Sequence, residues 1–296
     1  MAVRLGLGTV QFGLNYGVSN VSGQPSEDEV KKILACASAG GIDVIDTAAA
    51  YGDAESVLGR CLTESAQIRV VTKTIPLRDR LPNTDSIKWI RDGLTRSLKR
   101  LRCESVDSLL VHHVGDLLDS PEDGVYAELL RLKQEGLVRR IGFSAYSGRE
   151  LDLALGRYDF DVVQLPMNAF DQRLLEGGQL QRLRARNIEV HVRSIFLQGL
   201  LLMDSSELPV YFNPIRFRLA AWRRFLLAHG LTAAQGALAF ARSLNVDVIL
   251  IGVENAAQLE RNLTDFASAN PEKIDFSAFA INDERFVNPS FWQLDA

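Results

Sequence analysis

The sequence predicts an α/β protein of the (β/α)8 TIM barrel class, with an extra helix after the seventh strand and a short C-terminal tail. Short runs rich in Val, Ile and Leu alternate with longer segments of helical spacing, and eight such runs occur within the 296 residues. Apolar runs without a polar face are typical of parallel strands that are covered on both sides. Eight strand–helix units in a chain of this length match a closed barrel. We expect a single domain over residues 1–296.

The expected strands share their apolar composition. They are Arg4–Phe12, Val44–Ala48, Arg69–Ile75, Ser108–Val114, Arg140–Tyr146, Val162–Asn168, Glu189–Ile195 and Val248–Val253. An open doubly wound sheet is the second choice, and it would favour a glycine-rich phosphate loop after the first strand. That strand instead ends in GLGTVQ, which lacks the third glycine of GxGxxG, and no helix is expected directly after it.

The expected helices are marked by their caps and by apolar residues at helical spacing. The first, Val30–Ala39, follows a capping box of Ser26 and Glu29 and ends at Gly40-Gly41. The region between Gly199 and Gly230 is too long for a simple connection, so we expect the extra helix there, near Ile215–Ala228. The remaining helices are expected at Ser86–Leu101, Leu129–Gln134, Leu151–Leu155, Leu180–Ala185, Ala233–Ser243 and Ala256–Phe266.

Composition excludes several classes of protein. The net charge of −4 is the opposite of the basic footprint of a nucleic-acid binder. No apolar run reaches the ~18 residues of a membrane span, and the N-terminus does not have the shape of a signal peptide. The three cysteines are far apart and form no CxxC pattern, which favours reduced thiols. We therefore expect a cytoplasmic protein that binds neither nucleic acid nor membrane.

Polar residues at the ends of three successive strands form a chemical set. Asp46 ends the second strand and Tyr51 follows it, Lys73 ends the third strand, and His112 ends the fourth. A buried carboxylate is costly unless it is paired, so we expect Asp46 to pair with Lys73. A nearby ammonium group stabilises a phenolate, so Lys73 is expected to lower the pKa of Tyr51. With His112 orienting the oxygen, such a site suits protonation of a carbonyl as hydride arrives at its carbon.

Each residue of this set also has an ordinary interpretation on its own. Asp46 caps a loop, Lys73 lies in solvent, and Tyr51 is a core aromatic. The combination on consecutive strands favours the catalytic interpretation. His112 and His113 are adjacent and are expected to point to opposite faces, so they would not share one metal ion, and no metal-binding motif occurs elsewhere.

At these residues the sequence resembles the aldo-keto reductase superfamily, whose members are (β/α)8 barrels that reduce carbonyls with NADPH or NADH. The stretch DTAAAYG at residues 46–52 matches the family pattern DTAxxYG, and Thr72-Lys73 and Asp107–His112 match its third and fourth strands. The resemblance implies that Tyr51 is the general acid. It implies that Lys73 and Asp46 tune this tyrosine and that His112 orients the carbonyl.

The resemblance also implies a set of cofactor contacts. Ser144 and Gln164 match residues that hold the nicotinamide amide, and Gly8, Thr9 and Val10 match the backbone beside it. The adenosine end is matched by Gly252, Gln258 and Asn262 in a GxxxxxQLxxN pattern, and Arg193 and Ser194 at the seventh strand belong to the same cofactor set.

Three departures from the family pattern bear on the cofactor. Ala145 replaces an asparagine that contacts the carboxamide. Arg193 stands where an aromatic often stacks on the nicotinamide; a guanidinium also stacks on rings, or reaches a pyrophosphate or an anionic substrate. Glu254 stands where Arg or Ser commonly meets the 2′-phosphate of NADP. A carboxylate there repels this phosphate and accepts hydrogen bonds from ribose, so NADH is favoured over NADPH. The alternative is that Glu254 faces solvent and Arg261 serves the phosphate.

The expected substrate pocket is polar. Asn15 and His113 favour a small polar or sugar-like aldehyde or ketone as the partner molecule, and Trp292 in the C-terminal tail either folds over the pocket or anchors the tail. Two other functions stay open: a nicotinamide-nucleotide-binding regulatory barrel with little turnover, and a sugar dehydrogenase that works mainly in oxidation. The sequence names neither the substrate nor the oligomeric state.

Overall fold

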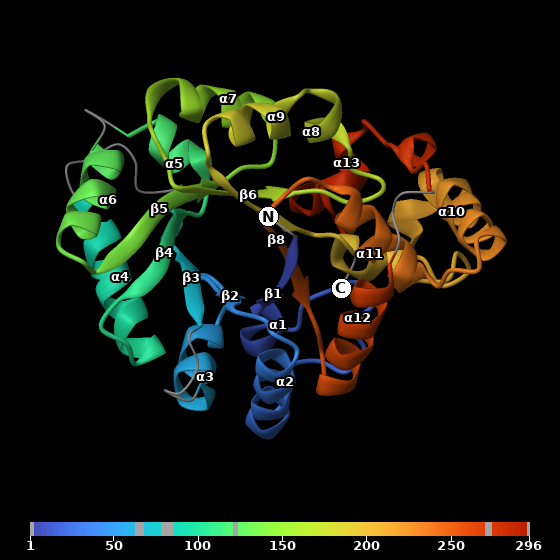
Figure 1. Cartoon of the computed structure of the whole chain (residues 1–296), viewed down its shortest axis with the longest axis horizontal. Coiled ribbons are helices and arrows are strands. Elements are labelled where there is room, and N and C mark those ends of the chain that lie inside the picture. Colours follow the sequence, from blue (N-terminus) through green and yellow to red (C-terminus); the bar gives the residue numbers. More distant parts are fainter. Residues whose placement is uncertain (1–2, 63–67, 78–85, 121–123, 270–273, 295–296) are drawn as a thin grey trace.

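The computed structural model describes residues 3–62, 68–77, 86–120, 124–269 and 274–294, and its centre is a closed barrel of parallel strands (Figure 1). Each strand pairs with the next along the chain, and the last pairs with the first. The predicted (β/α)8 fold is confirmed. The ends of the expected domain, residues 1–2 and 295–296, lie outside the described residues. The strands are β1 Arg4–Gly8, β2 Val44–Asp46, β3 Arg69–Lys73, β4 Val106–Val111, β5 Val138–Ser144, β6 Val162–Pro166, β7 Glu189–Arg193 and β8 Val248–Gly252.

Helices surround the strands, and the predicted extra helix α10 lies at the outer edge of the molecule beside α11 (Figure 1). The α-helices are α1 Val10–Gly13, α2 Glu27–Ala39, α3 Ala54–Cys61, α4 Ser86–Leu101, α5 Val114–Leu118, α6 Gly124–Gln134, α7 Gly148–Arg157, α8 Arg173–Glu176, α9 Gln179–Ala185, α10 Arg216–Ala228, α11 Ala233–Ser243, α12 Ala256–Ser268 and α13 Glu284–Val287. Short 3-10 segments are η2 Leu197–Leu202, η3 Val210–Ile215, η5 Ser277–Phe279 and η6 Pro289–Phe291.

Helix α2 shows how the local sequence sets an element. The Ser26 side chain accepts a hydrogen bond from the backbone N–H of Glu29, which satisfies one free donor of the first turn. The chain leaves the helix through Gly41, whose φ of +76° suits glycine. The residues that α2 buries against the barrel recur every three or four positions: Val30, Ile33, Leu34 and Ala37.

Side chains two residues apart on a strand face the same side of the sheet. In a closed barrel, alternate strands contribute the side chains of one interior layer, and here the odd-numbered strands β1, β3, β5 and β7 form such layers. The last residues of these strands, Gly8, Lys73, Ser144 and Arg193, line a cavity. At the opposite end, ion pairs join Arg4, Arg69 and Glu189, the first residues of β1, β3 and β7, to one another or to Arg140, the third residue of β5. A small buried cluster of apolar residues lies apart from the main core: Val44, Val71, Leu110, Val162, Val248 and Leu250. By their positions on the strands, these apolar residues lie between the Asp46–Lys73 pair at the strand ends and the ion pairs at the strand starts.

The first strand is shorter than expected, and the expectation that no helix follows it directly was wrong. Strand β1 ends at Gly8, and Val10–Gly13 form the single turn α1. Thr9 leaves the strand direction because its backbone N–H and its hydroxyl both donate to the Asp46 carbonyl. Gly13 then approaches the backbone after β2 so closely that a Cβ would lie 2.0 Å from the carbonyl oxygen of Tyr51. Tertiary contacts therefore decide the conformation of this segment.

Candidate active site

Asp46 and Lys73 form a buried ion pair at the carboxyl ends of β2 and β3. The Lys73 ammonium nitrogen lies 2.8 and 2.7 Å from the two carboxylate oxygens of Asp46 and donates a third hydrogen bond to the Thr47 carbonyl at 3.0 Å. Both side chains are almost fully buried. Gln164 of β6 donates its amide N–H to Asp46 at 2.7 Å. Three strands thus fix the charge pair that the sequence predicts.

Tyr51 lies in the loop after β2, with its hydroxyl 3.3 Å from the Lys73 ammonium nitrogen. The same nitrogen lies 4.8 Å from the centre of the tyrosine ring. The loop turns at Gly52, which has a φ of +52° and would carry a Cβ only 2.3 Å from the Gly13 carbonyl oxygen. Only glycine fits there, and this close approach places the Tyr51 side chain beside Lys73.

The electrostatics of Tyr51 differ from the expectation that Lys73 lowers its pKa. Burial raises the pKa of Tyr51, the Asp46 carboxylate raises it further, and the cation that opposes both is Arg193. Burial also lowers the pKa of Lys73, while the charge and the hydrogen bonds of Asp46 oppose this shift. Tyr51 is therefore a protonated phenol at neutral pH, which is the form that a general acid needs.

His112 faces Tyr51, but the expected opposite orientation of His113 was wrong. The rings of Tyr51 and His112 meet edge to face with centroids 5.9 Å apart. The rings of His112 and His113 stack at 4.9 Å and 16°. Strand β4 ends at Val111, so the alternation of side chains along a strand does not extend to this pair. His112 is also fixed by its backbone N–H, which donates to the Thr74 hydroxyl at 3.2 Å.

These residues line a cavity of about 750 Å³ that runs from the catalytic set to the N-terminus of α12, a volume typical of ligand sites. Every predicted catalytic and cofactor residue lies in its wall: Asp46, Tyr51, Lys73, His112, Gly8, Thr9, Val10, Ser144, Gln164, Arg193, Ser194, Gly252, Glu254, Gln258 and Asn262. The three predicted substrate residues do not line it: Asn15 is exposed, His113 stacks behind His112, and Trp292 packs against Phe212 at 4.9 Å. Pro289 and Ser290 of the C-terminal tail line the cavity instead.

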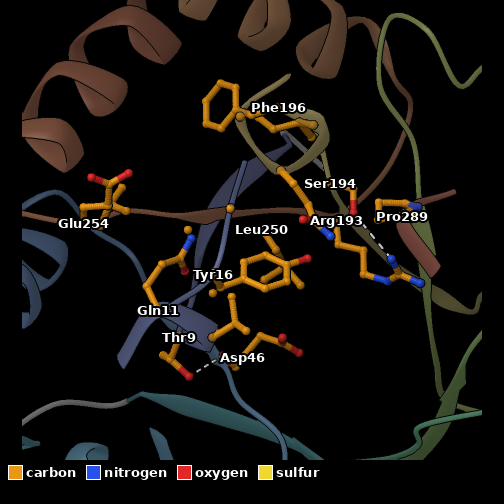
Figure 2. Close-up of a pocket in the computed structure, with 18 of the residues that line it drawn as sticks. Thr9, Gln11, Tyr16, Asp46, Arg193, Ser194, Phe196, Leu250, Glu254 and Pro289 are labelled. Atoms are coloured by element: carbon orange, nitrogen blue, oxygen red, sulfur yellow. Dashed lines mark hydrogen bonds between the residues drawn. The ribbon is translucent and has the colours of Figure 1, made fainter. Parts of the chain in front are cut away.

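Several wall residues were missed by the sequence reasoning. Tyr16 lies in the middle of the cavity, between Glu254 on one side and Arg193 on the other (Figure 2). Burial raises the pKa of Tyr16, Tyr51 contributes in the same direction, and Arg193 opposes it. Tyr146 lies two residues after Ser144 and also lines the cavity. The signal that points to Tyr146 is its position directly after the end of β5.

The loop after β7 is held in an unusual backbone conformation. Ser194, Leu197 and Gln198 have φ values of +64°, +48° and +53°, a region that non-glycine residues rarely adopt. The Gln198 carbonyl accepts a hydrogen bond from the backbone N–H of Val18 at 2.9 Å. This contact joins the β7 loop to the β1 loop across one side of the cavity, and such strain is typical of ligand-binding segments.

Two buried polar atoms in the wall have no partner and suit a bound amide. The side-chain oxygens of Gln164 and Gln11 are both buried without a hydrogen bond. Gln164 has its N–H on Asp46, so its oxygen is an acceptor of fixed position. A carboxamide N–H of nicotinamide would satisfy it. The residues present therefore fit a nicotinamide nucleotide.

The other end of the cavity lies at the N-terminus of α12. Asn255 caps this helix by accepting from the Gln258 N–H, and the Gln258 side-chain oxygen accepts from the Glu254 N–H at 2.8 Å. Glu29 of α2 reaches the same place, because its carboxylate accepts a hydrogen bond from the Ala256 N–H at 2.9 Å. Glu254 and Arg261 both lie in the cavity wall at the expected adenosine end. Glu29 lies behind this wall, where its carboxylate also pairs with Lys32 at 3.2 Å.

Among the described residues, no group of three or more His, Cys, Asp or Glu side chains is arranged to hold a metal ion. Within the same part of the chain, no helix has the length and apolar character needed to cross a membrane. The three cysteines are free thiols.

Comparison with known proteins defines the class of protein. The family model described as "Aldo/keto reductase family" matches residues 4–277, so the chain belongs to the aldo-keto reductase family, whose members are oxidoreductases that use NAD(P)H.

Curated relatives fit this assignment. The chain is 33% identical over 144 residues to an aldo-keto reductase of Mycolicibacterium vanbaalenii, covering 45% of this chain and 47% of that protein. It is 28% identical over 216 residues to the NADH-specific methylglyoxal reductase of Escherichia coli, covering 67% of this chain and 65% of that protein. The matched region thus spans about half to two thirds of the length of these relatives.

A solved structure shows the same fold. The holo form of an aldo-keto reductase from Bacillus halodurans matches with a TM-score of 0.74, over 93% of this chain and 90% of that one, at 21% identity.

Proposed function

We propose that this protein transfers hydride between a nicotinamide cofactor and the carbonyl carbon of a small polar or sugar-like aldehyde or ketone, with Tyr51 as the general acid. The observation that carries the proposal is the contact between the Tyr51 hydroxyl and Lys73, which is itself fixed by Asp46. The 3.3 Å contact supports proton delivery, because the ammonium group donates to the phenol oxygen and stabilises the charge that develops there.

In this proposal, the chain binds, orients and protonates the substrate. His112, edge to face with Tyr51, and the Tyr51 hydroxyl hold the carbonyl oxygen between them. Burial keeps Tyr51 protonated until a developing alkoxide takes its proton. Gln164 and Ser144 hold the carboxamide of the cofactor, which supplies the hydride when it is bound. The polar wall around Tyr16, Arg193 and Ser290 favours a substrate with hydroxyl or anionic groups.

We further propose that the cofactor is NADH rather than NADPH. Glu254 lines the cavity at the N-terminus of α12, and the Ala256 N–H of that helix is already bonded by the Glu29 carboxylate instead of being free for a phosphate. A carboxylate beside a 2′-phosphate would repel it. The name of the Escherichia coli relative, an NADH-specific reductase, agrees with this choice. Arg261 is the residue that would favour NADPH instead.

The test is a calorimetric titration of the whole protein with NADH and with NADPH, in wild type, Glu254→Gln and Glu254→Arg. We expect tighter binding of NADH by wild type, and a preference reduced by ~10-fold or more in Glu254→Arg because charge repulsion becomes attraction. Arg261→Gln is the matched control. If wild type prefers NADPH and only the Arg261 variant weakens it, the NADH assignment is wrong.

A further inference from the structure

Arg193 at the end of β7 carries a charge that is not neutralised within the part of the chain that the structure describes. Its Nη2 is buried without a hydrogen-bond partner, and its Nη1 makes only a long contact of 3.4 Å with the Ser194 hydroxyl. The nearby carboxylates are ion-paired with other cations: Asp46 with Lys73, and Asp171, whose charge also acts on Arg193, with Arg173 at 2.7 Å. Arg193 is thus a cation in the cavity wall that makes no ion pair of its own within the described residues.

The guanidinium of Arg193 is held in place by an aromatic ring. Its central carbon lies 4.2 Å from the centre of the Tyr146 ring, close enough for a cation–π contact. Both side chains line the cavity. The group extends along one side of the cavity, toward Pro289 and past Tyr16 (Figure 2). Tyr146 therefore covers one side of the guanidinium and holds it in the cavity wall.

Strand register places Arg193 beside the expected carboxamide site. Ser144 of β5 pairs with Gln164 of β6, and Gln164 pairs with His191 of β7. Arg193 lies two residues further along β7 and therefore on the same face, at the end of the strand. A pyridine ring whose carboxamide is held by Ser144 and Gln164 would extend past the strand ends, where Arg193 lines the same cavity.

We propose that Arg193 makes the site discriminate between the two oxidation states of the nicotinamide cofactor. This inference rests on the proposed function, because it requires the cofactor to bind here. The oxidised ring carries a positive charge and the reduced ring is neutral. A guanidinium without an ion-pair partner beside the ring repels the oxidised cofactor and tolerates the reduced cofactor. The guanidinium of Arg193, already placed over the Tyr146 ring, is also suited to stacking on a ring of the cofactor.

The consequence is selective loading with reduced cofactor. The protein binds reduced cofactor more tightly than oxidised cofactor, so in a mixture of the two it takes up mainly the reduced form and releases the oxidised form readily after carbonyl reduction. The same cation lowers the pKa of Tyr51 against the effect of burial. Arg193 therefore acts on both sides of the reaction: it weakens the hold on the oxidised cofactor and eases proton release from the acid.

The test is calorimetric titration with NAD⁺, NADH, NADP⁺ and NADPH, which needs no turnover. We compare wild type with Arg193→Met, which keeps the length without the charge, and with Arg193→Lys, which keeps the charge. We expect the ratio of oxidised to reduced dissociation constants to fall roughly tenfold in Arg193→Met and to be largely retained in Arg193→Lys. Tenfold corresponds to about 30 mV for a two-electron couple. Arg139→Met, at a side chain 77% exposed, is the surface control.

The outcomes separate this inference from the proposed function. If both oxidation states bind but the ratio is the same in Arg193→Met, the inference is overturned and the cofactor assignment stands. If the ratio is unchanged while KM for a carboxylate-bearing aldehyde rises, Arg193 reads the substrate, which also overturns it. If no nucleotide binds wild type, the proposed function and the inference both fail. A ratio that falls in both Met and Lys variants assigns the effect to shape rather than to charge, and rejects the inference.

Discussion

The two ends of the barrel interior are both charged, but they handle charge differently. At the end where the strands begin, the Glu189 carboxylate accepts hydrogen bonds from Arg69 at 3.0 Å, from Arg140, and from Nε2 of His191 at 2.8 Å. Arg140 also donates to Asp107 at 3.1 Å. At the end where the strands finish, Asp46 and Lys73 are paired, while Arg193 has no partner carboxylate within the described residues.

This difference separates buried charges that serve the fold from those that are available to a ligand. A buried charge that is ion-paired within the fold is costly to leave without its partner. A charge without an ion-pair partner inside the protein is a candidate for pairing with a ligand or with a reaction. In the strand-start network every arginine faces a carboxylate, although Nη2 of Arg69 has no hydrogen bond, whereas Arg193 makes no ion pair within the described residues. Tyr51, buried and protonated beside a paired lysine, joins the functional end.

The largest expected effect tests the functional end directly. In Tyr51→Phe, the hydroxyl that lies 3.3 Å from Lys73 is lost while the ring stays. We expect kcat/KM for a small aldehyde to fall by ~10²-fold or more, since general acid catalysis contributes at least that much. Tyr126→Phe is the matched control, because its hydroxyl bonds only the Asp159 backbone, at the surface. Equal activity of Tyr51→Phe and wild type would remove Tyr51 from the mechanism.

A pair of arginine variants tests the contrast between the ends. Arg140→Met leaves Asp107 and Glu189 short of a partner, and we expect the free energy of unfolding to fall by about 3 kcal/mol. Arg193→Met removes a charge that makes no ion pair with a carboxylate of the described residues, and we expect the free energy of unfolding to stay the same or to rise. Urea denaturation measures both. Similar losses in the two variants would show that the ends of the barrel handle charge alike.

Much of this arrangement was predictable from the sequence, because strand count and helix spacing are local signals. The catalytic set was predictable because DTAAAYG and Thr72-Lys73 place specific residue types at strand ends. The strand-start network was not. Arg4, Arg69 and Glu189 each begin a strand and Arg140 is the third residue of β5, positions near a strand start where a charged residue usually lies in solvent, and only the closed barrel brings them into one layer.

Other features depended on tertiary contacts that no local pattern encodes. The turn α1 exists because Thr9 bonds the Asp46 carbonyl and Gly13 packs on the Tyr51 backbone. The cation that lowers the pKa of Tyr51 is Arg193, and this required knowing that both side chains line one cavity. Asn15, His113 and Trp292, which were predicted to contact the substrate, do not line the cavity, because they lie in loops whose paths are set by packing.

The smallest effect sharpens the comparison through pH. Burial alone would raise the pKa of the Glu189 carboxyl, but the bond from His191 and the charges of Arg140 and Arg69 hold it well below its usual range. A carboxyl with a depressed pKa contributes stability that is present above ~pH 4.3, its ordinary value, and is lost as the pH falls below it. Arg4, at 3.7 Å, is the remaining charge that faces it.

We therefore expect the stability gap between wild type and Glu189→Gln to be widest near pH 7 and to narrow as the pH falls from about 4.5 toward 3. Urea denaturation at several pH values measures the gap, and using the difference cancels the contributions that both proteins share. A gap that stays constant with pH would mean that Glu189 gains nothing from being ionised. The network at the strand starts would then be no better compensated than Arg193, and the distinction between the two ends would fail.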